Sequence, residues 1–338
     1  MLRFACFGAF FATSTAAYKI LLYWAVDSNP ETQAKVKANV EYAKSIPQGG
    51  DDCCDVMLWH YKGKPEEWKD QVWYSKTVVR NHSSAGFKFK GLKLMYEDKN
   101  YTEKWVDKYE WVWALDSDVD FTQVNLARLF ELCRKSGAMI VSPTFLGDAA
   151  QWTEFNMNLQ GMDLRQQENH KKHAHNEHAV NAIAADGTVR ETDFGEDENA
   201  IATQINVIGK PNKNCQFRHT TYVEMTAPLL HGKVLSALFE NCDKCIGENA
   251  EWGLDRIWCR HAKKTMGNSK PCAYIDETPV LHLDWRTAAV NGEFKKSEQI
   301  VRDTHGDEFA RIEVVDCVSR SGTLPSAPSP PVAEVALR

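Results

Sequence analysis

Continuous apolar runs of strand length, separated by helical segments, are the feature that most constrains the fold of this chain. The runs lie at residues 19–26 (KILLYWAV), 55–61 (DVMLWHY) and 111–115 (WVWAL), and each is apolar enough to be buried on both faces of a sheet. Pro30 follows the first run and suits the first turn of a helix. Strands and helices that alternate in this way form βαβ units. We therefore predict a Rossmann-related α/β fold with a mostly parallel central sheet flanked by helices.

Composition narrows the class of protein. The 338 residues are 43% hydrophobic and 25% charged, which excludes a mainly disordered chain, a coiled coil and a collagen-like repeat. The 40 Lys and Arg residues against 46 Asp and Glu residues give a net charge of −6, which disfavours nucleic acid as a partner. We predict a single domain over residues 18–316, a size that one core can support.

Two stretches lack a core pattern. Residues 149–216 are polar, and we predict that they form an irregular insertion. Residues 317–338 are rich in proline, and we predict a disordered tail. Four histidines lie close together in the insertion: His170, His173, His175 and His178. They could bind a metal, but the pattern is more typical of solvated loop histidines.

The N-terminus predicts export. Residues 1–17 combine Arg3, an apolar stretch and small residues before Lys19, which is typical of a signal peptide or a short signal anchor. The alternative is a buried first strand or helix. We expect the chain in the secretory pathway (the lumen of the endoplasmic reticulum or Golgi) or secreted, with a possible membrane association through this segment.

Cysteine usage agrees with an oxidising compartment. Of the ten cysteines, cleavage of the signal would remove Cys6 and leave nine, an odd number that predicts at least one free or intermolecular thiol. Cys242 and Cys245 could be half of a zinc site, but no further CxxC or CxxH pair follows at ligand spacing. A local disulfide or plain packing in the core is therefore the favoured interpretation. Asn81 and Asn100 begin sequons and are glycosylatable in that compartment.

The strongest chemical signal is the sequence DSDVD, directly after the run at residues 111–115. Ligands of open α/β sheets bind just past the carboxyl ends of strands, and carboxylates there suit Mg²⁺ or Mn²⁺. We therefore predict that Asp116 and Asp118 bind a divalent cation. The alternative is an acidic turn before the next helix, which we expect to begin after Thr122 as its cap. That role fits Asp120, because a carboxylate is favourable at a helix N-terminus.

Two enzyme classes place such a motif after a buried strand. Haloacid-dehalogenase-type phosphatases use a DxDx(T/V) sequence, and DSDV at residues 116–119 fits it. Their motif ends the first strand of the domain, whereas here several strands and helices come first, and the later lysine and GDxxxD partners are not found. The position favours the nucleotide-sugar-binding half of a GT-A glycosyltransferase.

The C-terminal half carries a specific resemblance. The motifs YVEMTAP (222–228), EWGLD (251–255) and IDETPVLH (275–282) follow DVMLWHYKG and YEWVWALDSDVDF in order. Together they resemble the glycosyltransferase-like family called "domain of unknown function 707", over about residues 18–286. In that family an acidic residue is common at the position of Ser117. The resemblance implies a GT-A-like fold, a nucleotide-sugar donor and a Mn²⁺ or Mg²⁺ cofactor.

The resemblance also implies metal ligands. In GT-A folds the first aspartate of the motif reaches the ribose or the metal and the second binds the metal, which here are Asp116 and Asp118. A distal histidine often completes the site, and His282 ends an apolar strand where it could do so. The alternative for His282 is a buried histidine that hydrogen-bonds to the backbone.

Further residues are candidates for binding and proton transfer. Asp255 resembles the acid of the WG-acid motif, so it is our candidate general base, with a helix N-terminal carboxylate as the alternative. Glu224 could contact donor or acceptor. The lysines of residues 88–96, a helical segment, could hold the donor phosphates (Lys90 and Lys93, with Lys88), or they could form a solvated basic face.

The sequence therefore predicts a metal-dependent glycosyltransferase that uses a nucleotide sugar and a glycan or other hydroxyl acceptor. Two alternatives stay open. One is a non-catalytic carbohydrate-binding protein on the same fold, since fold does not fix function. The other is a phosphatase with Asp116 as its nucleophile.

Overall fold

The computed structural model describes the chain in segments: residues 19–45, 54–68, 71–101, 104–159, 208–242, 244–246, 251–283, 292–306, 311–320 and 322–323. The predicted signal segment, the histidine cluster and most of the predicted tail lie outside these residues. Among the described residues, no helix combines the length and apolarity that a membrane span requires.

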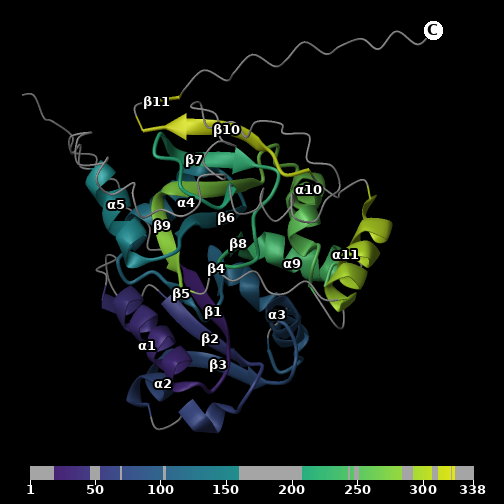
Figure 1. The fold of residues 1–338 in the computed structure, drawn as a ribbon. Helices are drawn as coiled ribbons and strands as arrows, with labels where there is room; N and C mark the ends of the chain where they lie inside the picture. The colour runs from purple at the N-terminus through teal and green to yellow at the C-terminus, as the bar shows by residue number, and fades with distance from the viewer. Residues whose placement is uncertain are drawn as a thin grey trace, which may run out of the picture.

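The described strands form one sheet (Figure 1). The strands are β1 (Ile20–Val26), β2 (Cys54–His60), β3 (Val78–Ser83), β4 (Trp111–Leu115), β5 (Val119–Asp120), β6 (Ile140–Leu146), β7 (Cys215–Thr220), β8 (Leu229–His231), β9 (Cys272–His282), β10 (Val314–Ser319) and β11 (Gly322–Thr323). Their order is β11-β10-β7-β9-β6-β8-β4-β1-β2-β3, and β5 pairs with β9 off this path.

The sheet confirms the predicted α/β class with a mostly parallel central sheet. Strands β3, β2, β1 and β4 are parallel neighbours, and β6 runs parallel to β9. Strand β8 lies antiparallel between β4 and β6, and antiparallel pairings add β7, β10 and β11 at one edge. Every residue of β4 is buried, as its uninterrupted apolar sequence predicts.

Helices cover the sheet (Figure 1). The helices are α1 (Pro30–Ser45), α2 (Val72–Thr77), α3 (Lys88–Glu97), α4 (Leu126–Ser136), α5 (Ala149–Leu159), α9 (Gly232–Asn241), α10 (Leu254–Met266) and α11 (Gly292–Thr304), with 3₁₀ turns η1 (Pro65–Trp68) and η2 (Trp105–Lys108). Helix α1 begins at the predicted proline. The cap predicted for α4 is wrong: Asn125, not Thr122, accepts the backbone N–H of Arg128 at 3.0 Å.

A glycine on α3 lets this helix approach the sheet closely. A Cβ placed on Gly91 would lie 2.3 Å from Cδ2 of the buried Trp59 on β2, so only glycine permits this packing. The close approach fixes α3 over β1 and β2. This placement matters for the site, because the first residue of α3 is Lys88.

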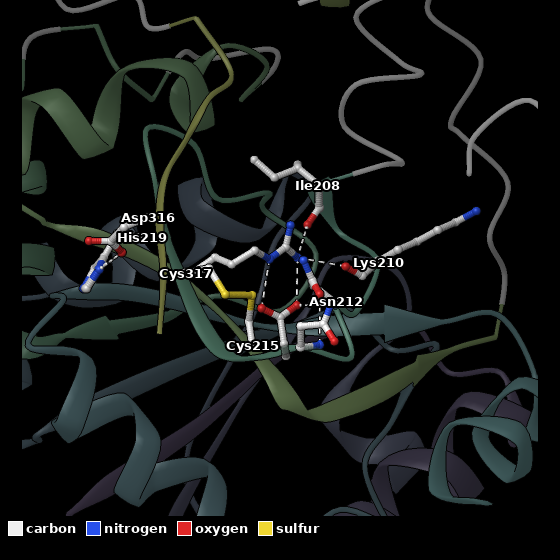
Figure 2. The surroundings of a disulfide bond; sticks show 10 residues. Ile208, Lys210, Asn212, Cys215, His219, Asp316 and Cys317 are labelled. Atoms are coloured by element: carbon white, nitrogen blue, oxygen red, sulfur yellow. Dashed lines mark hydrogen bonds and ion pairs between the residues drawn. A yellow bond between two sulfur atoms is a disulfide. The ribbon is translucent and has the colours of Figure 1, made fainter. Parts of the chain in front are cut away.

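Two predicted boundaries are corrected. The predicted insertion at 149–216 begins with helix α5 and ends inside β7, while residues 160–207 lie outside the described part. The predicted tail at 317–338 begins inside β10, which pairs with β7 and continues into β11. Strands β7 and β10 are ordered by partners that are distant in the sequence. The Cys215–Cys317 disulfide joins these two strands directly (Figure 2).

A buried ion pair holds this edge of the sheet together (Figure 2). Arg218 of β7 donates to both carboxylate oxygens of Asp276 on β9, each at 2.8 Å, and neither side chain is exposed. Arg218 also donates to the carbonyls of Ile208 and Lys210, and the backbone N–H of Asn212 donates to Asp276. A buried pair of charges is tolerated when further hydrogen bonds satisfy it, and here Nη1 of Arg218 is the side-chain atom of the pair that these bonds leave without a partner. The segment before β7 is thereby bound to the sheet.

Candidate active site

The acidic turn lies between β4 and β5. Asp116 follows the last residue of β4, and its backbone N–H donates to the carbonyl of Thr226 at 3.0 Å. Strand β5 then pairs antiparallel with β9, with Val119 opposite His282. This register sets the Nε2 of His282 3.2 Å from Oδ2 of Asp118. The structure thus brings together a carboxylate and an imidazole that are far apart in the sequence.

Asp118 and His282 shift each other's titration. Burial disfavours the charged form of Asp118, but the hydrogen bond and charge of His282 outweigh it and lower the pKa of Asp118. Burial likewise opposes the charge on His282, and Asp118 outweighs it and raises the pKa of His282. The two side chains are 25% and 16% exposed, so the pair is accessible from solvent. Asp118 and His282 offer a carboxylate and an imidazole, donors that suit Mn²⁺ or Mg²⁺, whereas the ligand atoms of Asp116, Asp118 and His282 do not all lie within 4.8 Å of one another.

Lys88 holds Asp116. Its Nζ donates to Oδ1 of Asp116 at 2.7 Å and to the carbonyls of Ala114 at 3.3 Å and Thr226 at 3.0 Å, and it also contacts the carbonyl of Met225. The Lys88 side chain is 8% exposed, whereas that of Asp116 is 42% exposed. Desolvation raises the pKa of Asp116, and the Lys88 ammonium works against that shift. One face of Asp116 is therefore bound to the protein, while much of the side chain still meets solvent.

Of the three lysines on helix α3, Lys88 is the one whose ammonium contacts the acidic turn. Lys93 pairs with Glu97 at 3.7 Å along the helix, the arrangement of a solvated face. Lys90 uses its backbone N–H, which donates to the buried carboxylate of Glu251. Glu251 therefore caps the first turn of α3, where a carboxylate is favourable. Burial raises the pKa of Glu251 to about 7, against the backbone N–H bonds that favour its charge.

A second acidic group belongs to the same site. Burial raises the pKa of Glu224 to about 7; His282 opposes this shift, whereas Asp255 and Asp116 add to it. Burial raises the pKa of Asp255 to about 6, and the hydroxyl of Tyr222, which donates to its Oδ2 at 2.8 Å, opposes the shift. Each of these charges shifts the pKa of another group, so Glu224 and Asp255 are electrostatically coupled to the acidic turn and to His282.

The position of Asp255 follows from the turn before it. Gly253 has φ 97°, a left-handed conformation that favours glycine, and it forms the N-cap of α10. Asp255 lies in the first turn of that helix, where the helix dipole favours its charge. The hydrogen bond from Tyr222 points its carboxylate back toward the β7–β8 connection. Asp255 is therefore a carboxylate at a helix N-terminus, as the alternative interpretation predicted. Its charge also contributes to the raised pKa of Glu224.

Three groups of the site were missed from the sequence: the Lys88–Asp116 contact, the Glu251 cap and the two tyrosines. Tyr222 and Tyr274 are fully buried, and the Tyr274 hydroxyl accepts the backbone N–H of Glu224 at 2.9 Å. Tyr222 begins the motif YVEMTAP, so its place in that motif was the available signal.

Lys88→Met is expected to destabilise the protein by about 1–3 kcal/mol. The change removes the donor shared by three backbone carbonyls and a carboxylate; the Thr226 carbonyl keeps the N–H of Asp116, and loss of the donor to the remaining buried acceptors costs about that much. Chemical denaturation measures the loss. Lys93→Met on the same helix is the matched control, with an expected change within about 0.5 kcal/mol. Equal stability of the two variants would contradict this role for Lys88.

Glu224→Gln is expected to raise the unfolding temperature at pH 8 and to lose most of this advantage as the pH falls to about 4.5. The folded pKa of Glu224, about 7, lies above its ordinary value, so its charge destabilises the fold above pH 7 and not below about pH 4.5. Glutamine has no charge to bury. Thermal unfolding with a chelator present measures both variants across this range. An advantage of the variant that grows toward low pH would contradict the sign of the shift.

The family model described as "Protein of unknown function (DUF707)" matches residues 22–189. This match confirms the predicted resemblance over the part of the chain that holds DVMLWHYKG and YEWVWALDSDVDF, while the three C-terminal motifs lie outside the matched residues. Among curated proteins, no sequence matches the chain.

Solved structures with a similar fold include those of two different proteins. TarS 1-349 from S. aureus, in complex with UDP-GlcNAc, has a TM-score of 0.48 and 8% identity, and the alignment covers 87% of this chain and 68% of that one. The mannosyltransferase PcManGT from Pyrobaculum calidifontis, in complex with GDP-Man and Mn²⁺, has a TM-score of 0.38 and 12% identity, with 87% and 64% covered.

Proposed function

We propose that this chain, which matches the DUF707 family over residues 22–189, is a metal-dependent glycosyltransferase with a nucleotide-sugar donor and a hydroxyl acceptor. The observation that carries the proposal is the 3.2 Å approach of Asp118 and His282 beside Asp116, at the carboxyl end of β4. Ligands of open α/β sheets bind at this end of the strands. An acidic pair with an imidazole at that position suits a cation that carries a nucleoside diphosphate.

Asp116, Asp118 and His282 would hold Mn²⁺ or Mg²⁺. When bound, the ion supplies a Lewis acid that stabilises negative charge on the departing diphosphate. Lys88 donates to Oδ1 of Asp116 and so fixes the orientation of this carboxylate before a cation binds. We assign the donor site to this end of the sheet. Lys90 and Lys93 stay predictions as phosphate ligands.

Asp255 would accept the proton of the acceptor hydroxyl. Its pKa of about 6 keeps it ionised at neutral pH and close enough to that pH for proton transfer. The Tyr222 hydroxyl, at 2.8 Å, fixes the orientation of the carboxylate. Glu224 would contact donor or acceptor beside it.

A thermal-shift screen of nucleotide sugars, with and without Mn²⁺, tests the donor. A ligand that binds the folded state raises the unfolding temperature by mass action, and we expect this rise to require the metal. Release of nucleoside diphosphate from the same sugar then tests catalysis. Binding without release would favour the non-catalytic alternative, and a phosphorylated Asp116 after incubation with a phosphomonoester would favour the phosphatase.

We also infer a lumenal location. The disulfides Cys215–Cys317, Cys259–Cys272 and Cys242–Cys245 support an oxidising compartment, and Cys133 is the free, buried cysteine of the described residues. Asn81 and Asn100 are exposed, as glycan acceptors must be. A loss of mass on treatment of the secreted or lumenal protein with an N-glycosidase tests this inference.

A further inference from the structure

Three side chains of metal-binding type meet outside the acidic site. Cys242 directly follows α9, Cys245 lies three residues on, and His305 directly follows α11. Their ligand atoms all lie within 4.8 Å of one another, and Sγ of Cys245 is 3.5 Å from Nε2 of His305. The two cysteines are joined by a disulfide in this structure. The partner that sequence spacing failed to supply for this pair thus comes from 60 residues away.

We propose that Cys242, Cys245 and His305 form a zinc site when the disulfide is reduced. Two thiolates and an imidazole are a donor set that zinc prefers, with water as a fourth ligand. A dithiol reductant would pass two electrons and two protons to the disulfide and become a disulfide itself. Zn²⁺ then replaces the two thiol protons. The disulfide joins the two cysteines to each other, whereas zinc would also join them to His305.

The ligands are held in place by their own backbone. The N–H of Cys242 donates to the carbonyl of Leu238 at 3.3 Å, and that of Cys245 donates to the carbonyl of Cys242 at 3.4 Å. The N–H of His305 donates to the carbonyl of Val301 at 2.8 Å. None of these bonds depends on the sulfur–sulfur link. The backbone of each ligand residue is therefore held at its own helix end when the disulfide opens, while the two sulfurs are free to separate and face an ion.

Burial suits this chemistry. Cys242 and Cys245 are 6% and 1% exposed, so a bound ion would be shielded from competing solvent on the sulfur side. His305 is half-buried and leaves a side open for the ion to enter. The hydrophobic surroundings of a metal site control solvent access to it.

The link would also steady the loop that precedes Asp255. Ser297 of α11 donates from its hydroxyl to the carbonyl of Trp252 at 3.2 Å. A Cβ on Gly253 would lie 3.1 Å from Cβ of Val301, so α11 packs tightly on this turn. An ion bound by Cys242, Cys245 and His305 would join the ends of α9 and α11 and restrain α11 against the turn, which the local disulfide between Cys242 and Cys245 does not do. The zinc site itself does not depend on the proposed transferase activity.

Zinc and cobalt binding to the full chain test the proposal. The protein is reduced anaerobically, loaded with Zn²⁺ or Co²⁺ and desalted. We expect one more equivalent of zinc in the reduced than in the oxidised protein, and a cobalt–thiolate charge-transfer band that the acidic site cannot produce. His305→Asn should weaken zinc binding at least as strongly as the roughly 10- to 100-fold typical for loss of an outer-shell partner. The matched control is His82→Asn, at an exposed histidine of β3, which should bind zinc as the wild type does.

Two results would overturn the proposal: a reduced wild type without the cobalt–thiolate band, or His305→Asn with unchanged zinc affinity. Reduction also opens the disulfides Cys215–Cys317 and Cys259–Cys272. A variant with Cys242→Ser and Cys245→Ser therefore shows by circular dichroism whether the fold survives reduction elsewhere. If it does not, the reductant is limited so that Cys215–Cys317 and Cys259–Cys272 stay closed, and equal zinc content in wild type and His305→Asn then overturns the proposal.

Discussion

Asp118→Asn is expected to lower Mn²⁺-dependent turnover by about 10²–10³-fold. Asparagine keeps the size of the side chain but removes the charge that faces His282 at 3.2 Å and that would bind the cation. Metal stabilisation of a leaving group contributes several kcal/mol, and each 1.36 kcal/mol corresponds to about a factor of ten in rate. Released nucleoside diphosphate measures the rate, and the electron paramagnetic resonance signal of free Mn²⁺ measures binding. Both should fall together.

Asp120→Asn is the matched control, two residues along the same turn. Oδ1 of Asp120 accepts the backbone N–H of Thr122 at 2.8 Å and its hydroxyl at 2.7 Å, so this carboxylate serves the turn and not a ligand. The amide oxygen of asparagine can accept the same bonds, and we expect turnover near that of the wild type. Equal losses in both variants would point to a damaged turn rather than a metal site. Full activity of Asp118→Asn would remove the metal from the proposed function.

The central strands could be predicted because each one contains a continuous run of apolar residues, which indicates burial. Strand β4 has no polar residue, and a run of that kind is stable only when covered on both faces. Strand β10, with the sequence VVDCVS, carries no such signal. It is ordered by its pairing with β7 and by a disulfide that spans 102 residues. Contacts of that range leave no trace in a short window of sequence.

The same distinction holds for the candidate site. Asp116 and Asp118 were identifiable because charge follows directly on a buried strand, and His282 because it ends another. Lys88 was weighed as a phosphate ligand or part of a solvated face, because a lysine at the start of a short amphipathic helix has no local pattern that indicates burial. Its role depends on the packing of α3 against the sheet, where Tyr23 of β1 donates to the Lys88 carbonyl at 2.7 Å. That packing is a tertiary property.

Asp255→Asn is expected to reduce the chemical step by about 10²–10⁴-fold, the usual contribution of a positioned general base. The amide cannot take up the acceptor proton. In the wild type, kcat/KM should fall as the pH drops below about 6, because the carboxylate then becomes protonated and its pKa is about 6. A pH profile of both proteins at saturating Mn²⁺ measures the effect. The variant should lose this acidic limb together with its rate.

Tyr222→Phe separates positioning from a merely structural role. The buried hydroxyl donates to Oδ2 of Asp255 at 2.8 Å and favours its charged form, so its removal should raise the pKa of Asp255. The acidic limb of kcat/KM should therefore move to higher pH, while the rate at high pH changes less than in Asp255→Asn. A uniform loss of rate with the limb unmoved would mean that another group limits the reaction. Glu224, with a pKa of about 7 in the same cluster, would then be the base to test.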